Sequence, residues 1–169
     1  EQMREIGIKP NAIILEPEGR NTAPAITIGA LRAFDEYEDS ILLVLSSDHI
    51  FENPENFLNI IKLGYEYAIK NRLVTFGVIP TYPETGYGYI EGEDFFNKNQ
   101  KEGVKIKRFV EKPNIDNARK FCEDKKFLWN SGIFMFKSSL VIKELNKYEP
   151  LMIESCKASY EKRSMDLDF

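Results

Sequence analysis

The chain is poor in cysteine and histidine. Its 169 residues include only two cysteines, Cys122 and Cys156, and one histidine, His49. Two cysteines do not make a disulfide framework, and the absence of a CxxC pair argues against a zinc site. Two separate thiols fit a reducing compartment, so we predict a cytoplasmic protein.

Long apolar runs and excess positive charge are also missing. The longest apolar run, Ile41–Leu45, is far too short to span a bilayer. The net charge of −4 argues against a protein that holds nucleic acid by charge alone. With 43% apolar and 30% charged residues, the composition is that of an ordinary globular protein. We therefore predict neither a nucleic-acid nor a membrane partner.

Strand-like and helix-like segments alternate along the first half of the chain. The expected strands are Ala12–Leu15, Ile41–Leu45 and Leu73–Ile79. The expected helices are Thr22–Tyr37, with Thr22 as its N-cap, and Pro54–Lys70. Continuous apolar runs are typical of strands buried on both faces. The β-α-β-α-β order predicts a parallel sheet with right-handed crossovers.

The second half is more mixed, and both ends of the chain look cut. The expected elements there are strands at Gly86–Glu91, Val104–Glu111 and Gly132–Phe136 and helices at Asn114–Asp124 and Ser138–Tyr148. Glu1–Gly7 resembles the end of a helix that Gly7 stops. The charged residues 160–169 lead into no further element. We predict one continuous unit that is a piece of a longer protein.

Two polar segments follow expected strands and could bind a ligand. Asp48 comes directly after Ile41–Leu45, and a carboxylate at the carboxyl end of a strand can hold Mg²⁺. Glu16–Ala25 joins a strand end to a helix N-terminus, whose N–H groups favour an anion or a polar ligand edge. An ordinary capped loop is the alternative for each. For His49 a structural role is favoured over a general base.

Three further segments offer groups for a sugar or a phosphate. Gly86 and Gly88 permit close approach to the backbone, or form a tight turn. Glu111 can accept hydrogen bonds from sugar hydroxyls and Lys112 can neutralise a phosphate; a solvated charge pair at a strand end is the alternative. Asn130 can read a hydroxyl, or belong to a turn beside a packed Trp.

Taken together and in this order, these motifs resemble one family. The motifs are Glu16-Pro-Glu-Gly-Arg-Asn-Thr-Ala-Pro-Ala25, Ser47-Asp-His49, Thr75-Phe-Gly-Val-Ile-Pro-Thr81, Pro83-Glu-Thr-Gly-Tyr-Gly-Tyr-Ile90, Phe109-Val-Glu-Lys-Pro113 and Trp129-Asn-Ser-Gly132. They resemble the bacterial mannose-1-phosphate guanylyltransferases, within the sugar-nucleotidyltransferase superfamily. The resemblance covers about Glu1–Pro150. Each motif is weak alone, but the ordered set is specific.

The resemblance implies a fold and a reaction. The fold would be a Rossmann-like α/β nucleotide-diphospho-sugar transferase fold. It would have a mostly parallel mixed sheet with helices on both faces, lacking its N-terminal strands. Residues 1–80 would form the nucleotide-binding side, 81–150 the sugar-binding side and 151–169 a truncated tail. The reaction would be in-line transfer of GMP from GTP to α-D-mannose 1-phosphate with Mg²⁺, giving GDP-mannose and pyrophosphate for polysaccharide biosynthesis.

The family's roles also transfer residue by residue. On the nucleotide side, Glu16, Asn21 and Thr22 would help to hold guanine and ribose. Asp48 would be one of two carboxylates that bind Mg²⁺. On the sugar side, the backbone of Gly88 would contact a mannose hydroxyl, and Glu111 and Asn130 would bind mannose hydroxyls with their side chains. Lys112 would neutralise the sugar phosphate.

Two parts of the family pattern are absent from this sequence. One is the glycine-rich loop GGxGTRLWPxSR, and the other is the Ser-Ile-Asp-Tyr segment with the second metal carboxylate. We therefore expect little or no transferase activity from this chain alone. The missing strands would lie between Ala12–Leu15 and Ile41–Leu45, so exposed edges could give a homo-oligomer or a strand-swapped assembly. A pyrophosphorylase for another sugar or nucleotide and a non-catalytic sugar-nucleotide-binding module remain the alternatives.

Overall fold

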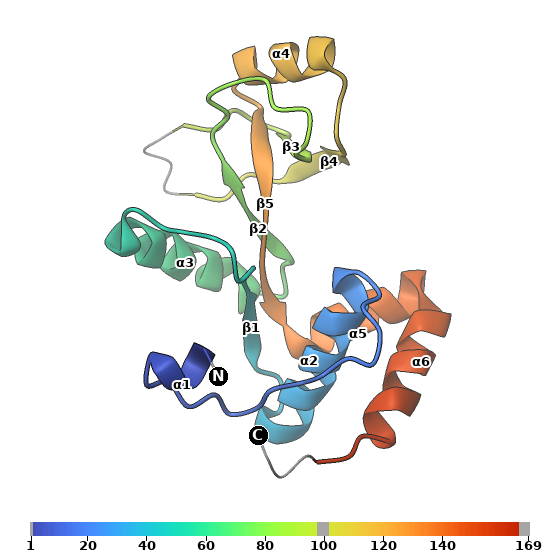
Figure 1. Ribbon diagram of the computed structural model, residues 1–169. Helices are drawn as coiled ribbons and strands as arrows, with labels where there is room; N and C mark the ends of the chain where they lie inside the picture. The colour runs from blue at the N-terminus through green and yellow to red at the C-terminus, as the bar shows by residue number, and fades with distance from the viewer. Residues whose placement is uncertain (1, 98–101, 166–169) are drawn as a thin grey trace. The chain divides into compact units, whose positions relative to one another are not determined.

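The computed structural model describes residues 2–97 and 102–165 (Figure 1). The elements in chain order are α1 (Gln2–Glu5), α2 (Thr22–Tyr37), β1 (Ile41–Val44), α3 (Pro54–Ala68), β2 (Val74–Val78), β3 (Tyr89–Gly92), β4 (Ile106–Val110), α4 (Ile115–Glu123), β5 (Phe127–Lys137), α5 (Ser138–Tyr148) and α6 (Pro150–Glu161). The chain divides into two compact units. Unit 1 comprises Glu1–Glu38 with Val141–Phe169, and unit 2 comprises Asp39–Leu140.

Unit 2 contains a five-stranded sheet built around the long strand β5. Every strand pairing in the described residues is antiparallel, so the prediction of a mostly parallel sheet was wrong. Phe134 of β5 pairs with Val44 on one edge and with Thr75 on the other. The strands β1 and β2 therefore run in the same direction, as a crossover connection requires, but β5 lies between them and runs the opposite way. Nothing in the local pattern of β5 indicates this direction.

The apolar runs of β1 and β2 are less buried than predicted. Leu43 is 36% exposed, and beyond the end of β1 Leu45 is 47% exposed. Val78 of β2 is 50% exposed. A run of apolar residues predicts burial on both faces only where neighbouring elements cover both. In the described part of the chain they do not.

The core of unit 2 lies where α4 packs on β3 and β5. Tyr89, Ala118, Phe127 and Trp129 form a buried cluster. The ring of Phe121 on α4 stacks on Phe127 with centroids 4.1 Å apart. This end of β5 is therefore held rigidly, because burial of aromatic rings dominates such packing.

Helix α3 packs closely on β2 because position 64 carries no side chain. A Cβ placed on Gly64 would lie 2.6 Å from Cζ of Phe76. The helix begins with Pro54, and the Asn53 side chain accepts a hydrogen bond from the Asn56 N–H at 2.9 Å. Close packing and a capped start fix α3, and with it the loop that connects β1 to α3.

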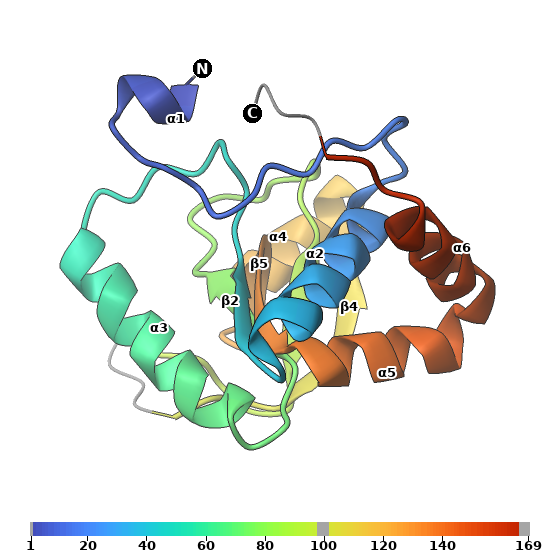
Figure 2. The ribbon, with the colours of Figure 1, turned by 90° about the horizontal axis from the view of Figure 1, so that it is seen from below.

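Unit 1 is helical, and α2 lies beside α6 in both views (Figure 1, Figure 2). Helix α2 has the predicted bounds, but Thr22 is its first helical residue and not its N-cap. Asn21 is the N-cap, with a φ of 66° and no side-chain capping hydrogen bond. Helix α6, which begins at Pro150, was not among the predicted elements. No helix in the described ranges is long and apolar enough to cross a membrane.

The strand predicted at Ala12–Leu15 is absent. The segment has no regular structure, and Ile13 and Leu15 are 50% and 66% exposed. A strand forms only where a neighbouring strand forms hydrogen bonds with its backbone N–H and C=O groups, and no described residue pairs with this segment. The predicted helix end is present as α1, and Gly7 follows it with a φ of 70°.

Candidate functional site

The candidate site lies where β5 changes its partner along one edge. Trp129 pairs with Tyr89 of β3 on the edge opposite Val78 of β2. Because β1 also lies opposite β2, the strands β1 and β3 share the same edge of β5. We call the stretch between their pairings, Asn130–Ile133, the fork. The start of β3 pairs with β5 just before the fork and the end of β1 pairs with it just after, so the two strands lie along different parts of β5 (Figure 1).

A bulge in β5 shapes the fork. Consecutive residues of β2, at 76 and 77, pair with residues of β5 that are three apart, Ile133 and Asn130. Gly132, inside this bulge, has a φ of 70° that favours glycine. The Trp129-Asn-Ser-Gly132 motif is therefore an interruption within a strand. The motif does not form the turn that was the alternative for Asn130. The strand predicted to begin at Gly132 begins at Phe127.

Three of the predicted sugar-side residues come together at the fork. A Cβ placed on Gly88 would lie 2.7 Å from Oε2 of Glu111 and 3.6 Å from Cβ of Asn130. The backbone N–H of Asn130 also donates to the carbonyl oxygen of Gly88 at 2.8 Å. Because Gly88 has no side chain, the Glu111 carboxylate can lie against its backbone, close to Asn130. That pair can accept from one hydroxyl and donate to another.

Lys112 joins this group through an unusual backbone conformation. Its φ is 41°, in the left-handed region. Neighbouring residues on a regular strand point to opposite faces, but β4 ends at Val110 and the chain turns at Lys112. The Lys112 ammonium lies 3.6 Å from Oε1 of Glu111, and both side chains are exposed. One cation and one carboxylate are thus available together to a ligand.

The loop that carries Asp48 begins at the same fork. A Cβ placed on Gly132 would lie 4.0 Å from Oγ of Ser46, two residues before Asp48. Nδ1 of the neighbouring His49 is buried and has no hydrogen-bond partner in the described part of the chain. No group of three or more His, Cys, Asp or Glu side chains there could hold a metal. Asp48 offers one carboxylate of the kind that Mg²⁺ takes, since this ion commonly binds one or two carboxylates and fills its shell with phosphate oxygens and water.

The predicted nucleotide-side residues belong to unit 1. Glu16 lies in the irregular segment before α2, and Asn21 and Thr22 form the start of that helix. The first turn of α2 contains no acidic residue, and Asn21 does not cap it. The N–H groups of this turn can therefore donate hydrogen bonds to an anion or to a ligand carbonyl.

An aromatic cluster that the sequence did not predict lies beside the fork. The rings of Tyr82 and Tyr87 contact Trp129 edge-on, with centroids 5.0 and 5.4 Å apart. Burial is the main factor that raises the pKa of Tyr82 and of Tyr89. The Tyr89 hydroxyl donates to the Glu84 carbonyl at 2.9 Å. This contact fixes the loop that leads to Gly88. The tyrosines themselves were visible in the Pro83–Ile90 motif, but their packing depends on residues far along the chain.

A second charged group lies on β3 and β4. Glu91 is 6% exposed and pairs with Lys107 at 2.7 Å and with Arg108 at 2.5 Å. Hydrogen bonds from Lys107 and then from Arg108 hold the pKa of Glu91 below its ordinary value. Because both oxygens of this carboxylate are engaged, we assign it a structural role.

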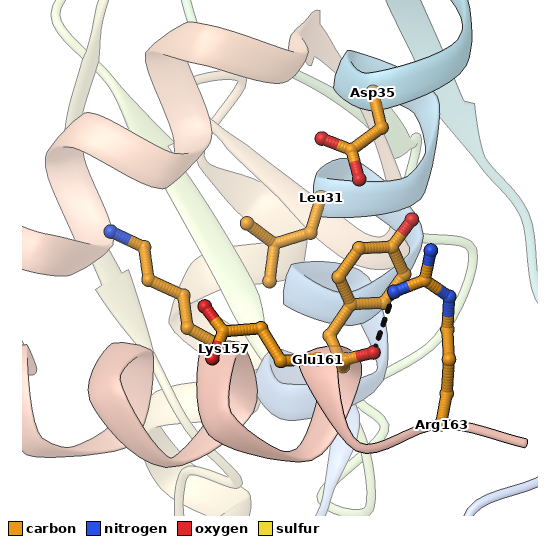
Figure 3. Close-up of a pocket in the computed structure, with 6 residues that line it drawn as sticks. Leu31, Asp35, Lys157, Glu161 and Arg163 are labelled. Atoms are coloured by element: carbon orange, nitrogen blue, oxygen red, sulfur yellow. Dashed lines mark hydrogen bonds between the residues drawn. The ribbon is translucent and has the colours of Figure 1, made fainter.

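Each of the two units contains a cavity. One, of about 320 Å³, lies in unit 2 between the start of α3 and the bulge, and Phe51, Phe76 and Ser131 are among its lining residues. The other, of about 260 Å³, lies in unit 1 between α2 and the end of α6 (Figure 3). Its charged side chains, Asp35, Lys157, Glu161 and Arg163, are of mixed sign. That mixture selects neither an anion nor a cation.

Comparison with known proteins identifies the family. The family model described as nucleotidyl transferase matches residues 1–169. The chain belongs to the nucleotidyl transferase family. It is 41% identical over its full length to the xanthan biosynthesis protein XanB of Xanthomonas campestris, of which it covers 35%. It is also 41% identical to a mannose-1-phosphate guanylyltransferase of Klebsiella pneumoniae, of which it covers 36%.

A solved structure supports the fold. The chain is 30% identical to a protein from Thermus thermophilus described as a mannose-1-phosphate geranyltransferase, with a TM-score of 0.80 over 96% of this chain and 46% of that one. The resemblance deduced from the motifs is thereby confirmed at the level of the family. Since the chain spans about a third of the length of the curated relatives it matches, the activity of the whole protein is a matter for proposal.

Proposed function

We propose that the chain is the sugar-binding and part of the nucleotide-binding portion of a mannose-1-phosphate guanylyltransferase. The whole protein would transfer GMP from GTP to α-D-mannose 1-phosphate and release pyrophosphate. The names of the curated relatives support the choice of mannose 1-phosphate. The observation that carries the proposal is the convergence of Gly88, Glu111 and Asn130 at the fork.

Each sugar-side group has a distinct task in this proposal. The carboxylate of Glu111 accepts from a mannose hydroxyl, and the amide nitrogen of Asn130 donates to a hydroxyl oxygen. The Lys112 ammonium neutralises the sugar phosphate, which must approach the α-phosphorus of GTP as a nucleophile. Gly88 leaves room for the sugar ring against the backbone. These groups do no covalent chemistry, so their contribution is orientation and charge neutralisation.

On the nucleotide side, Glu16, Asn21 and Thr22 would hold guanine and ribose. Asp48 is the residue that would hold Mg²⁺, which when bound neutralises the phosphate charge. We propose that the chain itself binds ligands but transfers GMP weakly or not at all, because its sequence contains neither the glycine-rich loop nor the second metal carboxylate of the family pattern.

Calorimetric titration of the chain with GDP-mannose, with and without Mg²⁺, tests the proposal. Binding should weaken in Glu111→Ala, because the carboxylate touches the sugar. A matched control is Glu93→Ala, which also removes an exposed carboxylate paired with a lysine, Lys105 at 2.8 Å. No binding at millimolar GDP-mannose, or equal weakening in both variants, would refute the proposal for this chain. Competition by GTP against ATP, UTP and dTTP distinguishes a guanylyltransferase from a pyrophosphorylase for another nucleotide.

A further inference from the structure

The hydroxyl of Ser131 closes the bulge in β5. It donates to the carbonyl oxygen of Phe76 on β2 at 2.5 Å and accepts from the N–H of Ile133 at 3.2 Å. At a bulge the regular ladder is interrupted, and backbone groups lose their partners. The Ser131 side chain supplies a donor to one such group and an acceptor to another. It therefore holds the shift in register between β2 and β5 at this point.

The closed bulge in turn fixes the side chain of Asn130. The N–H of Gly132 donates to Oδ1 of Asn130 at 3.2 Å. Gly132 reaches this position because the bulge turns the chain there, with a φ of 70°. With its oxygen engaged, Asn130 presents its amide nitrogen, which makes no hydrogen bond within the described ranges. The carboxamide is thus oriented as a donor, next to the Glu111 carboxylate that acts as an acceptor.

We propose that Ser131 is a positioning residue for sugar recognition. Its hydroxyl holds the bulge closed, so that Gly132 orients the Asn130 amide toward a ligand hydroxyl oxygen. The proposal rests on the proposed function, in which Asn130 touches the sugar. It extends that function by assigning the selectivity for a hydroxylated ligand to a residue that does not contact the ligand itself.

The central test compares two ligands, mannose 1-phosphate and GDP, by calorimetry on the full chain. Ser131→Ala should lower the affinity for mannose 1-phosphate by about tenfold, as expected for one misdirected hydrogen bond, and leave the affinity for GDP unchanged. Ser131→Thr keeps the hydroxyl, and the adjoining cavity of about 320 Å³ has room for the added methyl. This variant should restore binding. A general loss of structure would instead lower the affinity for both ligands.

A matched control exists in the same pair of strands. Thr75 of β2 also donates its hydroxyl to a backbone carbonyl of β5, that of Ile133, at 3.0 Å. It lies outside the bulge. Thr75→Val removes this hydrogen bond with little change in shape and should leave both affinities unchanged. If Ser131→Ala does not fold, Gly132→Ala strains the bulge and keeps the hydroxyl, and the same selective loss is expected.

A readout without ligand separates this inference from the proposed function. The Gly132 amide should exchange with solvent faster in Ser131→Ala than in the parent chain, when followed by NMR, and at the parent rate in Thr75→Val. Unchanged exchange at Gly132, or equal affinity of Ser131→Ala and the parent chain for mannose 1-phosphate, overturns the inference. If the parent chain binds no sugar phosphate, the proposed function fails, and the exchange measurement still decides whether Ser131 holds the bulge.

Discussion

A single methyl group at position 88 provides a sharp test of the sugar site. In Gly88→Ala the new Cβ would lie 2.7 Å from Oε2 of Glu111, so the carboxylate must move. The Glu111 side chain is 72% exposed, so it can move at little cost, and we expect the free energy of unfolding to change by less than about 1 kcal/mol. A lost hydrogen bond to a charged group costs about 1.5–3 kcal/mol of binding. Affinity for mannose 1-phosphate should therefore fall by about 10- to 150-fold.

The assay pairs calorimetric binding of mannose 1-phosphate with urea unfolding followed by Trp129 fluorescence. Gly86→Ala is the control, because its Cβ would lie 3.2 Å from Oε1 of Glu84, which is outside the proposed site. That variant should bind as the parent chain does. If Gly88→Ala unfolds as the parent chain does and binds with the same affinity, the placement of Glu111 in the sugar site is refuted.

Further predictions concern stability, titration and association. Gly64→Ala forces a Cβ to within 2.6 Å of Phe76, and urea unfolding should show a loss of about 1–3 kcal/mol. The native pKa of Glu91 lies below its ordinary value of 4.5. Its ion pairs therefore stabilise the fold above that pH. This advantage over Glu91→Gln should be lost in acid unfolding curves as the pH falls below 4.5 and through the native pKa. Burial raises the pKa of the Cys156 thiol, so its alkylation by iodoacetamide, followed by mass spectrometry, should be slow until the chain unfolds. The outer edges of β1 and β2 have no partner strand in the described ranges, so light scattering should show association that increases with concentration.

The helices could be predicted well because their signals are local. The structure gives α2 and α5 the predicted bounds, Thr22–Tyr37 and Ser138–Tyr148. The spacing of apolar residues and the prolines near the start of a helix lie within a few residues of each other in the sequence. The capping of α2 was wrong by one residue, since it depends on the backbone of Asn21, whose φ of 66° no spacing pattern indicates.

The sheet could be predicted only in part because strand pairing is not local. The run Ile41–Leu45 indicated a strand correctly, but its neighbour β5 lies far along the chain. No feature of either segment states the direction in which they pair. Ala12–Leu15 shows the converse case, in which a strand-like sequence finds no partner among the described residues and stays irregular. The predicted division into a nucleotide side and a sugar side is functional, and it stays a prediction.

The motifs identified the residues of the candidate site, but only the structure shows which of them lie close together. Gly88, Glu111 and Asn130 were each ambiguous in the sequence. Their proximity follows from β3, because Tyr89 pairs with Val110 of β4 on one side and with Trp129 of β5 on the other. The backbone also departs from regular structure here, with a φ of 41° at Lys112 and of 70° at Gly132. At Lys112 such a conformation costs free energy and persists only where surrounding contacts enforce it, whereas glycine adopts it readily. The contacts that hold the bulge around Gly132 include the hydroxyl of Ser131, a residue that a list of sugar-contacting groups would omit.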